Sequence, residues 1–218
     1  LEALGVNVNL TPEQMAQCVN EVGVGFMFAP NYHSAMKHAA PVRRELGVRT
    51  LFNLLGPMTN PAGAKNQVMG VFARDLVGKL ARVLKELGSR HVLVVHAVDG
   101  LDEISLGGDT HVAELREGDV SEYTLNPQQF GLDICSSEKL AVHNIDEAKA
   151  MLQSVFDNQD GPAKDIVCLN AGAAIYVGAG AGTLAEGIAK ARGAIESGAA
   201  KAKLGQLVGF TSRFAQKS

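Results

Sequence analysis

The sequence predicts an α/β fold with a mainly parallel central sheet flanked by helices. Two short, largely apolar runs, residues 67–72 and 91–96, read as buried strands. Between them, residues 75–87 place leucine and valine side chains on one face of a helix, and Gly88 follows as a stop signal. A strand, a helix and a second strand with short connections form a βαβ unit, whose two strands are parallel.

A hairpin and four further helices complete this part of the chain. Residues 110–125 alternate apolar and polar side chains around a Glu-Gly-Asp turn at 117–119, which is typical of a β-hairpin. Apolar periodicity then predicts helices at 145–156, 162–176, 184–195 and 199–213.

The N-terminal part is expected to be helical. Thr11 followed by Pro12, with Gln14 three residues after the threonine, is a strong helix start. Residues 1–4 read as the end of a helix that stops at Gly5, so the chain is expected to be part of a longer protein.

The segment that follows is harder to interpret. Residues 23–28 are short and apolar, which favours a strand or a buried loop. Residues 34–46 have a helical pattern, but Pro41 excludes one continuous helix, so we expect two short ones with the second beginning at Pro41.

Composition excludes several classes of protein. The chain has 218 residues and a net charge of −3, which gives no electrostatic basis for binding nucleic acid. No run of apolar residues is long enough to span a membrane, and the first residues do not resemble a signal peptide. The three cysteines are far apart in the sequence, which predicts reduced thiols and a cytoplasmic protein.

An acidic motif is the first candidate site. The run Asp-Gly-Leu-Asp-Glu at residues 99–103 comes directly after the strand that ends at His96. Ligands of open parallel sheets bind at the carboxyl ends of the strands, and adjacent carboxylates there can hold Mg²⁺ together with substrate phosphates. The alternative is a polar turn with solvated acids, which is common in such loops.

A cationic helix and a rigid loop form the second candidate. Arg43, Arg44 and Arg49 lie close together, and the guanidinium of an arginine matches a carboxylate with two hydrogen bonds. A loop containing Gly56 and Pro57 follows, in which glycine permits close backbone approach and proline stiffens the chain. A solvated helix face and an ordinary connector are the alternatives.

The histidines and a glycine-rich run are better explained by structural roles. The histidines lack metal-ligand spacing on a helix, although His96 ends a strand near the acidic motif. The Gly-Ala-Gly-Ala-Gly run at 178–182 follows a segment that reads as helix rather than strand, so a helix–helix connector is favoured over a dinucleotide site.

Three motifs in this order resemble those of anthranilate phosphoribosyltransferases. They are Pro-Val-Arg at 41–43, Leu-Gly-Pro-Met-Thr-Asn-Pro-Ala at 55–62 and Asp-Gly-Leu-Asp-Glu at 99–103. The resemblance implies a fold like that of pyrimidine nucleoside phosphorylases, with a small helical domain and a larger α/β domain. It also implies transfer of phosphoribosyl from phosphoribosyl pyrophosphate to the amine of anthranilate, in the second step of tryptophan synthesis.

The resemblance assigns roles to five residues. Arg43 would grip the carboxylate of anthranilate, Gly56 and Pro57 would face its ring, and Asp102 and Glu103 would hold Mg²⁺ on the pyrophosphate.

The resemblance also sets the expected organisation. Residues 1–47 would be helices of the helical domain, residues 48–218 the α/β catalytic domain, and the full-length protein a homodimer. The 218 residues contain neither the Gly-Thr-Gly-Gly-Asp loop nor the Lys-His-Gly-Asn-Arg segment of that family. We therefore expect the chain to be inactive on its own. A nucleoside phosphorylase-like enzyme and a non-catalytic relative that binds nucleic acid or a partner protein are the alternatives.

Overall fold

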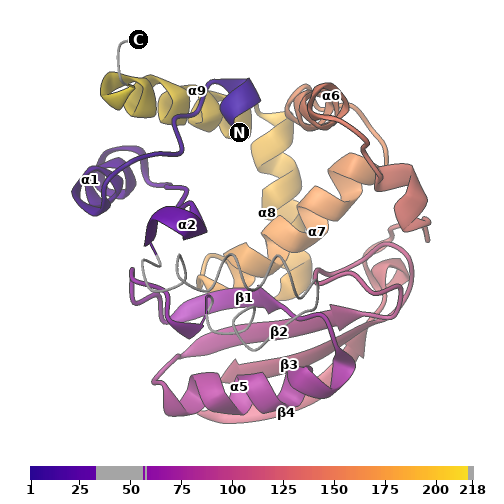
Figure 1. The fold of residues 1–218 in the computed structure, drawn as a ribbon. Helices are drawn as coiled ribbons and strands as arrows, with labels where there is room; N and C mark the ends of the chain where they lie inside the picture. Colours follow the sequence, from indigo (N-terminus) through magenta and orange to yellow (C-terminus); the bar gives the residue numbers. More distant parts are fainter. Residues whose placement is uncertain (33–55, 57, 216–218) are drawn as a thin grey trace, which may run out of the picture. The chain divides into compact units, whose positions relative to one another are not determined.

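The computed structural model describes residues 1–32, 56 and 58–215 (Figure 1). The helices expected around Pro41, and with them Arg43 and Pro57, lie outside the described residues. The chain divides into two compact units. The first combines Leu1–Pro61 with Ala199–Ser218, and the second is Ala62–Gly198.

The first unit is helical where it is described. Its elements are the short 3₁₀ helix η1 (Glu2–Leu4), helices α1 (Pro12–Val22), α2 (Ala29–Tyr32) and α9 (Ala199–Thr211), and η5 (Ser212–Phe214). The capping box predicted at Thr11 is confirmed, since Thr11 Oγ1 accepts from Gln14 N at 3.3 Å and Gln14 Oε1 accepts from Thr11 N at 2.9 Å. Gly5 ends η1 with a left-handed backbone (φ 92°), as predicted.

The prediction of a strand or a buried loop at residues 23–28 is wrong. The structure has neither a strand nor a buried stretch there, and Val24, Phe26 and Phe28 are each about two-fifths exposed. A short apolar run becomes a strand only where a partner strand and a covering layer exist, and the described part of this unit provides no sheet.

The core of the first unit joins residues that are far apart in the sequence. Side chains of α1 and of the segment before it, among them Cys18 and Leu10, pack with Leu207 and Phe210 of α9. Lys203 Nζ of α9 donates to the carbonyl of Val22 at 2.7 Å, at the C-terminal end of α1. The contacts thus group α9 with the N-terminal helices, whereas the boundary predicted between residues 47 and 48 lies outside the described residues and stays a prediction.

The second unit is built on a four-stranded sheet with the order β1-β2-β3-β4. Its strands are β1 (Asn66–Gly70), β2 (His91–Ala97), β3 (Thr110–Arg116) and β4 (Asp119–Leu125). Strands β1 and β2 are parallel and are joined through η2 (Arg74–Leu76) and helix α5 (Val77–Glu86), which confirms the βαβ unit. The α/β class predicted from the sequence is therefore correct.

The described sheet is more mixed than the sequence indicated. Only β1 and β2 pair in parallel, while β2–β3 and β3–β4 are antiparallel. The reason is local at the predicted hairpin: Glu117 and Gly118, with φ of 53° and 87°, form a two-residue turn, which can join only antiparallel strands.

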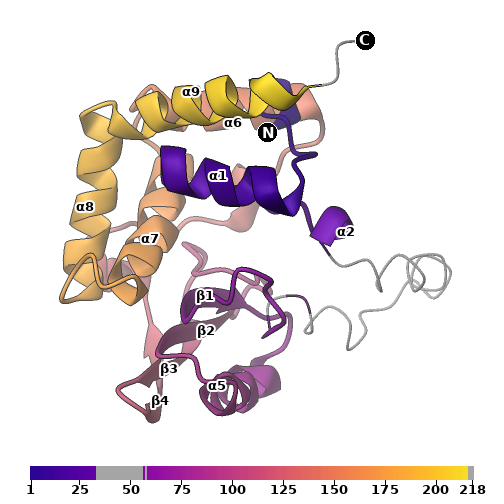
Figure 2. The same ribbon diagram turned by 90° about the vertical axis from the view of Figure 1, so that its left-hand side faces the viewer.

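Helices cover both faces of this sheet (Figures 1 and 2). Arg82 of α5 pairs with Glu122, the register partner of Ala113, whereas Tyr176 of α7 (Pro162–Val177) bonds to Glu114, the next residue along β3. Because successive strand residues point to opposite faces, α5 and α7 lie on opposite faces. In β2, residues Val92 to Val95 are all fully buried as a result.

Shorter elements and two further helices complete the unit. They are η3 (Pro127–Phe130), η4 (Ser137–Leu140), α6 (Ile145–Phe156) and α8 (Leu184–Glu196), and α6 and α8 begin at the predicted residues with Asn144 and Thr183 as N-caps. Within the described ranges, no helix has the length and apolar character needed to cross a membrane.

Helices α7 and α8 approach closely through two glycines. The Gly-Ala-Gly-Ala-Gly run at 178–182 connects them, as predicted, and is not part of a strand–helix fingerprint. A Cβ on Gly187 would lie 2.3 Å from the carbonyl oxygen of Gly172, and one on Gly172 would lie 2.6 Å from the amide of Ile188. Only hydrogen atoms fit at this crossing.

We expect Gly187→Ala to destabilise the protein by about 1–3 kcal/mol, because the new methyl group meets backbone that cannot rotate away. Urea unfolding followed by circular dichroism measures the change. Gly193→Ala in the same helix is the matched control, since a Cβ there meets no atom within 4 Å. The control should be neutral or stabilise by up to about 1 kcal/mol. Equal stability of the two variants would contradict the close helix packing.

Candidate functional site

The acidic motif lies in the loop that follows β2, at the carboxyl ends of the two parallel strands. Strand β2 ends at Ala97, and Gly100, with φ 91°, turns the chain so that Ala97 N donates to the carbonyl of Leu101 at 3.0 Å. Asp102 and Glu103 are exposed, whereas residues 104–106 are buried. The loop thus presents two carboxylates beside a buried stretch of backbone.

Asp99, the first acid of the motif, serves the loop itself. Its Oδ2 accepts a 2.5 Å hydrogen bond from Ser105 Oγ, and its Oδ1 accepts from Leu101 N at 3.3 Å. Ser105 Oγ in turn accepts from Gly107 N at 2.8 Å, and Ser105 N donates to Thr110 Oγ1 at 3.2 Å. These contacts close the loop on itself and leave Asp102 and Glu103 as the acids that face outward.

Strand β1 leaves room for the loop only because its last residue, Gly70, has no side chain. A Cβ built on Gly70 would lie 1.5 Å from the carbonyl oxygen of Asp102 and 2.5 Å from its carbonyl carbon. The backbone of Asp102 therefore rests directly on the end of β1.

The donor set fits a magnesium ion that is shared with a substrate. Asp102 and Glu103 offer carboxylate oxygens, which Mg²⁺ prefers, and Mg²⁺ commonly takes one or two carboxylates plus substrate phosphates and waters. Across residues 1–32, 56 and 58–215, no group of three or more metal-ligating side chains comes together. A pair of exposed carboxylates suits a metal whose coordination is completed by phosphate oxygens and waters.

An apolar cavity of about 520 Å³ adjoins the acidic pair. Leu101, Asp102 and Glu103 form one side, and the rest of the lining comes from η4, the segment after it, α6 and α7 and is almost entirely aliphatic. Partial desolvation, together with the charge of Asp102, raises the pKa of Glu103.

The anthranilate side of the predicted site is described at one residue only. Gly56 has helical backbone, and its carbonyl accepts from Thr59 N at 3.3 Å. Gly56 belongs to the first unit and the acidic pair to the second.

His96 has a structural contact. One ring nitrogen, Nδ1, lies 2.8 Å from the carbonyl oxygen of Val71, just beyond β1. His111 is its cross-strand partner, and desolvation, followed by the charges of Arg74 and His96, lowers the pKa of His111.

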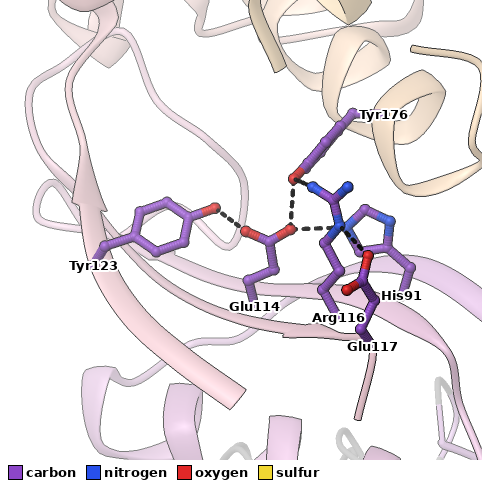
Figure 3. A network of polar contacts seen from close by, with 6 residues as sticks. All are labelled: His91, Glu114, Arg116, Glu117, Tyr123 and Tyr176. Carbon is purple, nitrogen blue, oxygen red and sulfur yellow. Dashed lines mark hydrogen bonds and ion pairs between the residues drawn. The ribbon is translucent and has the colours of Figure 1, made fainter. Parts of the chain in front are cut away.

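The sequence did not reveal a polar network at the other end of β2 (Figure 3). Glu114 accepts hydrogen bonds from His91 Nε2 at 2.8 Å, Tyr176 OH at 2.8 Å and Tyr123 OH at 2.9 Å, and Arg116 Nη1 donates to Tyr176 OH at 2.9 Å. The hairpin register could have indicated the Glu114–Tyr123 contact, but no sequence signal pointed to Tyr176.

The fold and the order of the motifs agree with the comparisons. The model of the glycosyl transferase family, α/β domain, matches residues 1–201. The chain belongs to this family. Curated relatives named anthranilate phosphoribosyltransferase include one from Thiobacillus denitrificans, 62% identical over 216 residues, and one from Methylobacillus flagellatus, 64% identical over 207 residues. The resemblance inferred from the three motifs is confirmed.

Coverage within the glycosyl transferase family is unequal. The match to the T. denitrificans protein takes in 99% of this chain but 63% of that protein, and the M. flagellatus match takes in 95% and 61%. The chain thus spans about three-fifths of the length of these relatives.

Solved structures show the same fold. Anthranilate phosphoribosyltransferase from Thermus thermophilus superposes with a TM-score of 0.89 at 42% identity, covering 97% of this chain and 63% of that one. The Saccharomyces cerevisiae enzyme in complex with PRPP and Mg superposes with a TM-score of 0.87 at 26% identity, covering 98% and 62%.

Proposed function

We propose that this chain is part of an enzyme that transfers the phosphoribosyl group of phosphoribosyl pyrophosphate to the amine of anthranilate, releasing pyrophosphate. One observation carries the proposal: an outward-facing Asp102–Glu103 pair at the carboxyl ends of β1 and β2, in a fold shared with a relative described with PRPP and Mg. The names of the curated relatives favour this reaction over the phosphorylase and non-catalytic alternatives.

Five residues of the chain would bind the metal ion and anthranilate. Asp102 and Glu103 would hold Mg²⁺, and the bound ion supplies positive charge to the departing pyrophosphate. Arg43 would fix the carboxylate of anthranilate with two parallel hydrogen bonds, while Gly56 and Pro57 would lie against its ring. An aromatic amine is already a nucleophile, so positioning by these residues replaces a strong base.

The setting of the enzyme is also a proposal. Cys18, Cys135 and Cys168 are all free and buried thiols, which supports a reducing, cytoplasmic environment. Assembly of the full-length protein as a homodimer is proposed from the family resemblance, and neither nucleic acid nor a membrane is proposed as a partner.

The reaction is followed by the loss of anthranilate fluorescence with phosphoribosyl pyrophosphate and Mg²⁺. We expect the 218-residue chain to be inactive, and the chain joined to the part of the T. denitrificans relative that it does not cover to be active. In the joined protein, Asp102→Asn should lower the rate about a hundredfold or more, because stabilisation of the leaving group is lost. Thr183→Ala, which removes the N-cap of α8, is the control with a folding cost only.

The contradicting results are clear. Turnover by the 218 residues alone would refute the expectation that they are inactive. An active joined protein in which Asp102→Asn is as fast as the control would refute the role of the acidic pair.

A further inference from the structure

The residue that follows the acidic pair is held by a side chain from a distant helix. Asn170, in α7, donates from Nδ2 to the carbonyl of Ile104 at 2.8 Å and accepts at Oδ1 from Ile104 N at 3.0 Å. Both backbone groups of one residue are thus bound by one amide. If the amide were reversed, its NH₂ group would face the N–H of Ile104 and its oxygen would face the carbonyl of Ile104. The backbone of Ile104 therefore fixes the orientation of the Asn170 amide.

Asn170 is itself well fixed. The second hydrogen of its Nδ2 is donated to the carbonyl of Ile166, one helical turn earlier, at 3.1 Å. Its neighbour Leu169 is fully buried, and α7 packs against β1 and β2. Ile104 is also buried, at 1% exposure, so the two hydrogen bonds join the loop to a rigid element of the unit.

The backbone of the acidic pair is therefore held on both sides of Glu103. Asp102 rests on the end of β1 at Gly70, and Ile104 is bound by Asn170. Only Glu103 stands between them. The backbone that carries both carboxylates is thus held in place without a ligand, and such preorganisation favours metal binding.

We propose that Asn170 is a positioning residue that holds Asp102 and Glu103 in the geometry that binds the metal ion. The proposal rests on the proposed function, because it takes the acidic pair as the metal-binding groups. Asn170 touches neither the metal nor the substrates in this role and acts through the backbone of Ile104.

Binding of Mn²⁺, with and without pyrophosphate, tests the proposal without turnover. Free Mn²⁺ is measured by electron paramagnetic resonance for the 218-residue chain and for Asn170→Ala, Asn170→Leu, Asp102→Asn and Thr183→Ala. The leucine variant keeps the side-chain volume, so the test does not depend on the alanine variant folding. Thr183→Ala is the matched control. It also removes one polar side chain, but this side chain contacts the start of α8 and not the acidic loop.

We expect both Asn170 variants to bind Mn²⁺ about ten- to a hundredfold more weakly, as is typical when a partner behind a metal ligand is removed. Amide exchange at Ile104 should accelerate in the same variants, and Thr183→Ala should match the parent chain in both measurements.

Three results would overturn the proposal, and they distinguish a failure of the positioning role from a failure of the metal role. If Asp102→Asn loses Mn²⁺ while the Asn170 variants bind normally, the acidic pair is the metal site and Asn170 does not position it. If Asp102→Asn binds as the parent chain does, or the parent chain binds no Mn²⁺ even with pyrophosphate, the proposed metal role fails and the positioning role fails with it.

Discussion

Gly70→Ala is expected to weaken metal binding by the acidic pair strongly. The new Cβ would overlap the carbonyl group of Asp102, at 1.5 Å from the oxygen, and main-chain atoms cannot swing away as a flexible side chain can. Either β1 or the loop must shift, and a displacement near 1 Å at a catalytic group costs about a hundredfold in rate. We expect Mn²⁺ affinity to fall at least as far as in Asn170→Ala.

The stability of Gly70→Ala distinguishes a shifted loop from a broken fold. Overpacking of this kind costs about 1–3 kcal/mol, so the variant should remain folded and lose metal binding out of proportion to its stability. Gly205→Ala, at an open position of α9, is the matched control: it should leave Mn²⁺ binding unchanged and be neutral or stabilise by up to about 1 kcal/mol. Normal Mn²⁺ binding by Gly70→Ala would show that the loop does not need its close contact with β1.

Glu114→Ala is expected to destabilise the second unit strongly. The carboxylate is the common acceptor for three donors, and its side chain is only 12% exposed (Figure 3). Truncation leaves the hydroxyl of Tyr123 and the ring nitrogen of His91 without this partner, while Tyr176 keeps its contact with Arg116. We expect a loss of about 2–4 kcal/mol in the free energy of unfolding, since each buried unsatisfied group costs about 1–3 kcal/mol.

The same carboxylate predicts a pH dependence. Burial alone would raise the pKa of Glu114, but the hydrogen bonds from its three partners outweigh it and lower the pKa below the ordinary value of 4.5. A lowered pKa in the folded state adds stability that is complete above the unfolded value and is lost as the pH falls through the folded value. Below pH 4.5, the stability difference between the parent chain and Glu114→Gln should therefore shrink.

Glu122→Ala is the matched control on the neighbouring strand. Glu122 forms an ion pair with Arg82, and both side chains are more than half exposed, so the expected loss is below about 1 kcal/mol. Urea unfolding between pH 3 and pH 7 measures the free energy of unfolding of the parent chain and of each of these variants. Equal losses for Glu114→Ala and Glu122→Ala would contradict the importance of the network.

Local sequence signals predicted local structure well. The capping box at Thr11, the turn at Glu117–Gly118 and the starts of α6 and α8 all depend on residues within four positions of one another. Residues 23–28 were wrongly assigned because strand formation depends on a partner that no local pattern reveals.

The candidate site could be predicted only in part, for the same reason. Asp102 and Glu103 lie in the loop after β2, at the carboxyl ends of the parallel strands, as expected for a ligand site, and their role in holding the metal stays a prediction. Asn170 could not be found, because its contact with Ile104 spans 66 residues and asparagine in a helix carries no sign of a distant partner. The roles of Arg43, Gly56 and Pro57 stay predictions.

The grouping of α9 with the N-terminal helices has a consequence for synthesis on the ribosome. Residues 62–198 form an uninterrupted unit, so all its strands and helices are available as soon as that stretch has emerged. The core of the first unit forms later, because Leu10 and Cys18 can pack against Leu207 and Phe210 only after nearly two hundred further residues have been made. The α/β unit is therefore expected to fold first, while α1 keeps its apolar face exposed until α9 arrives.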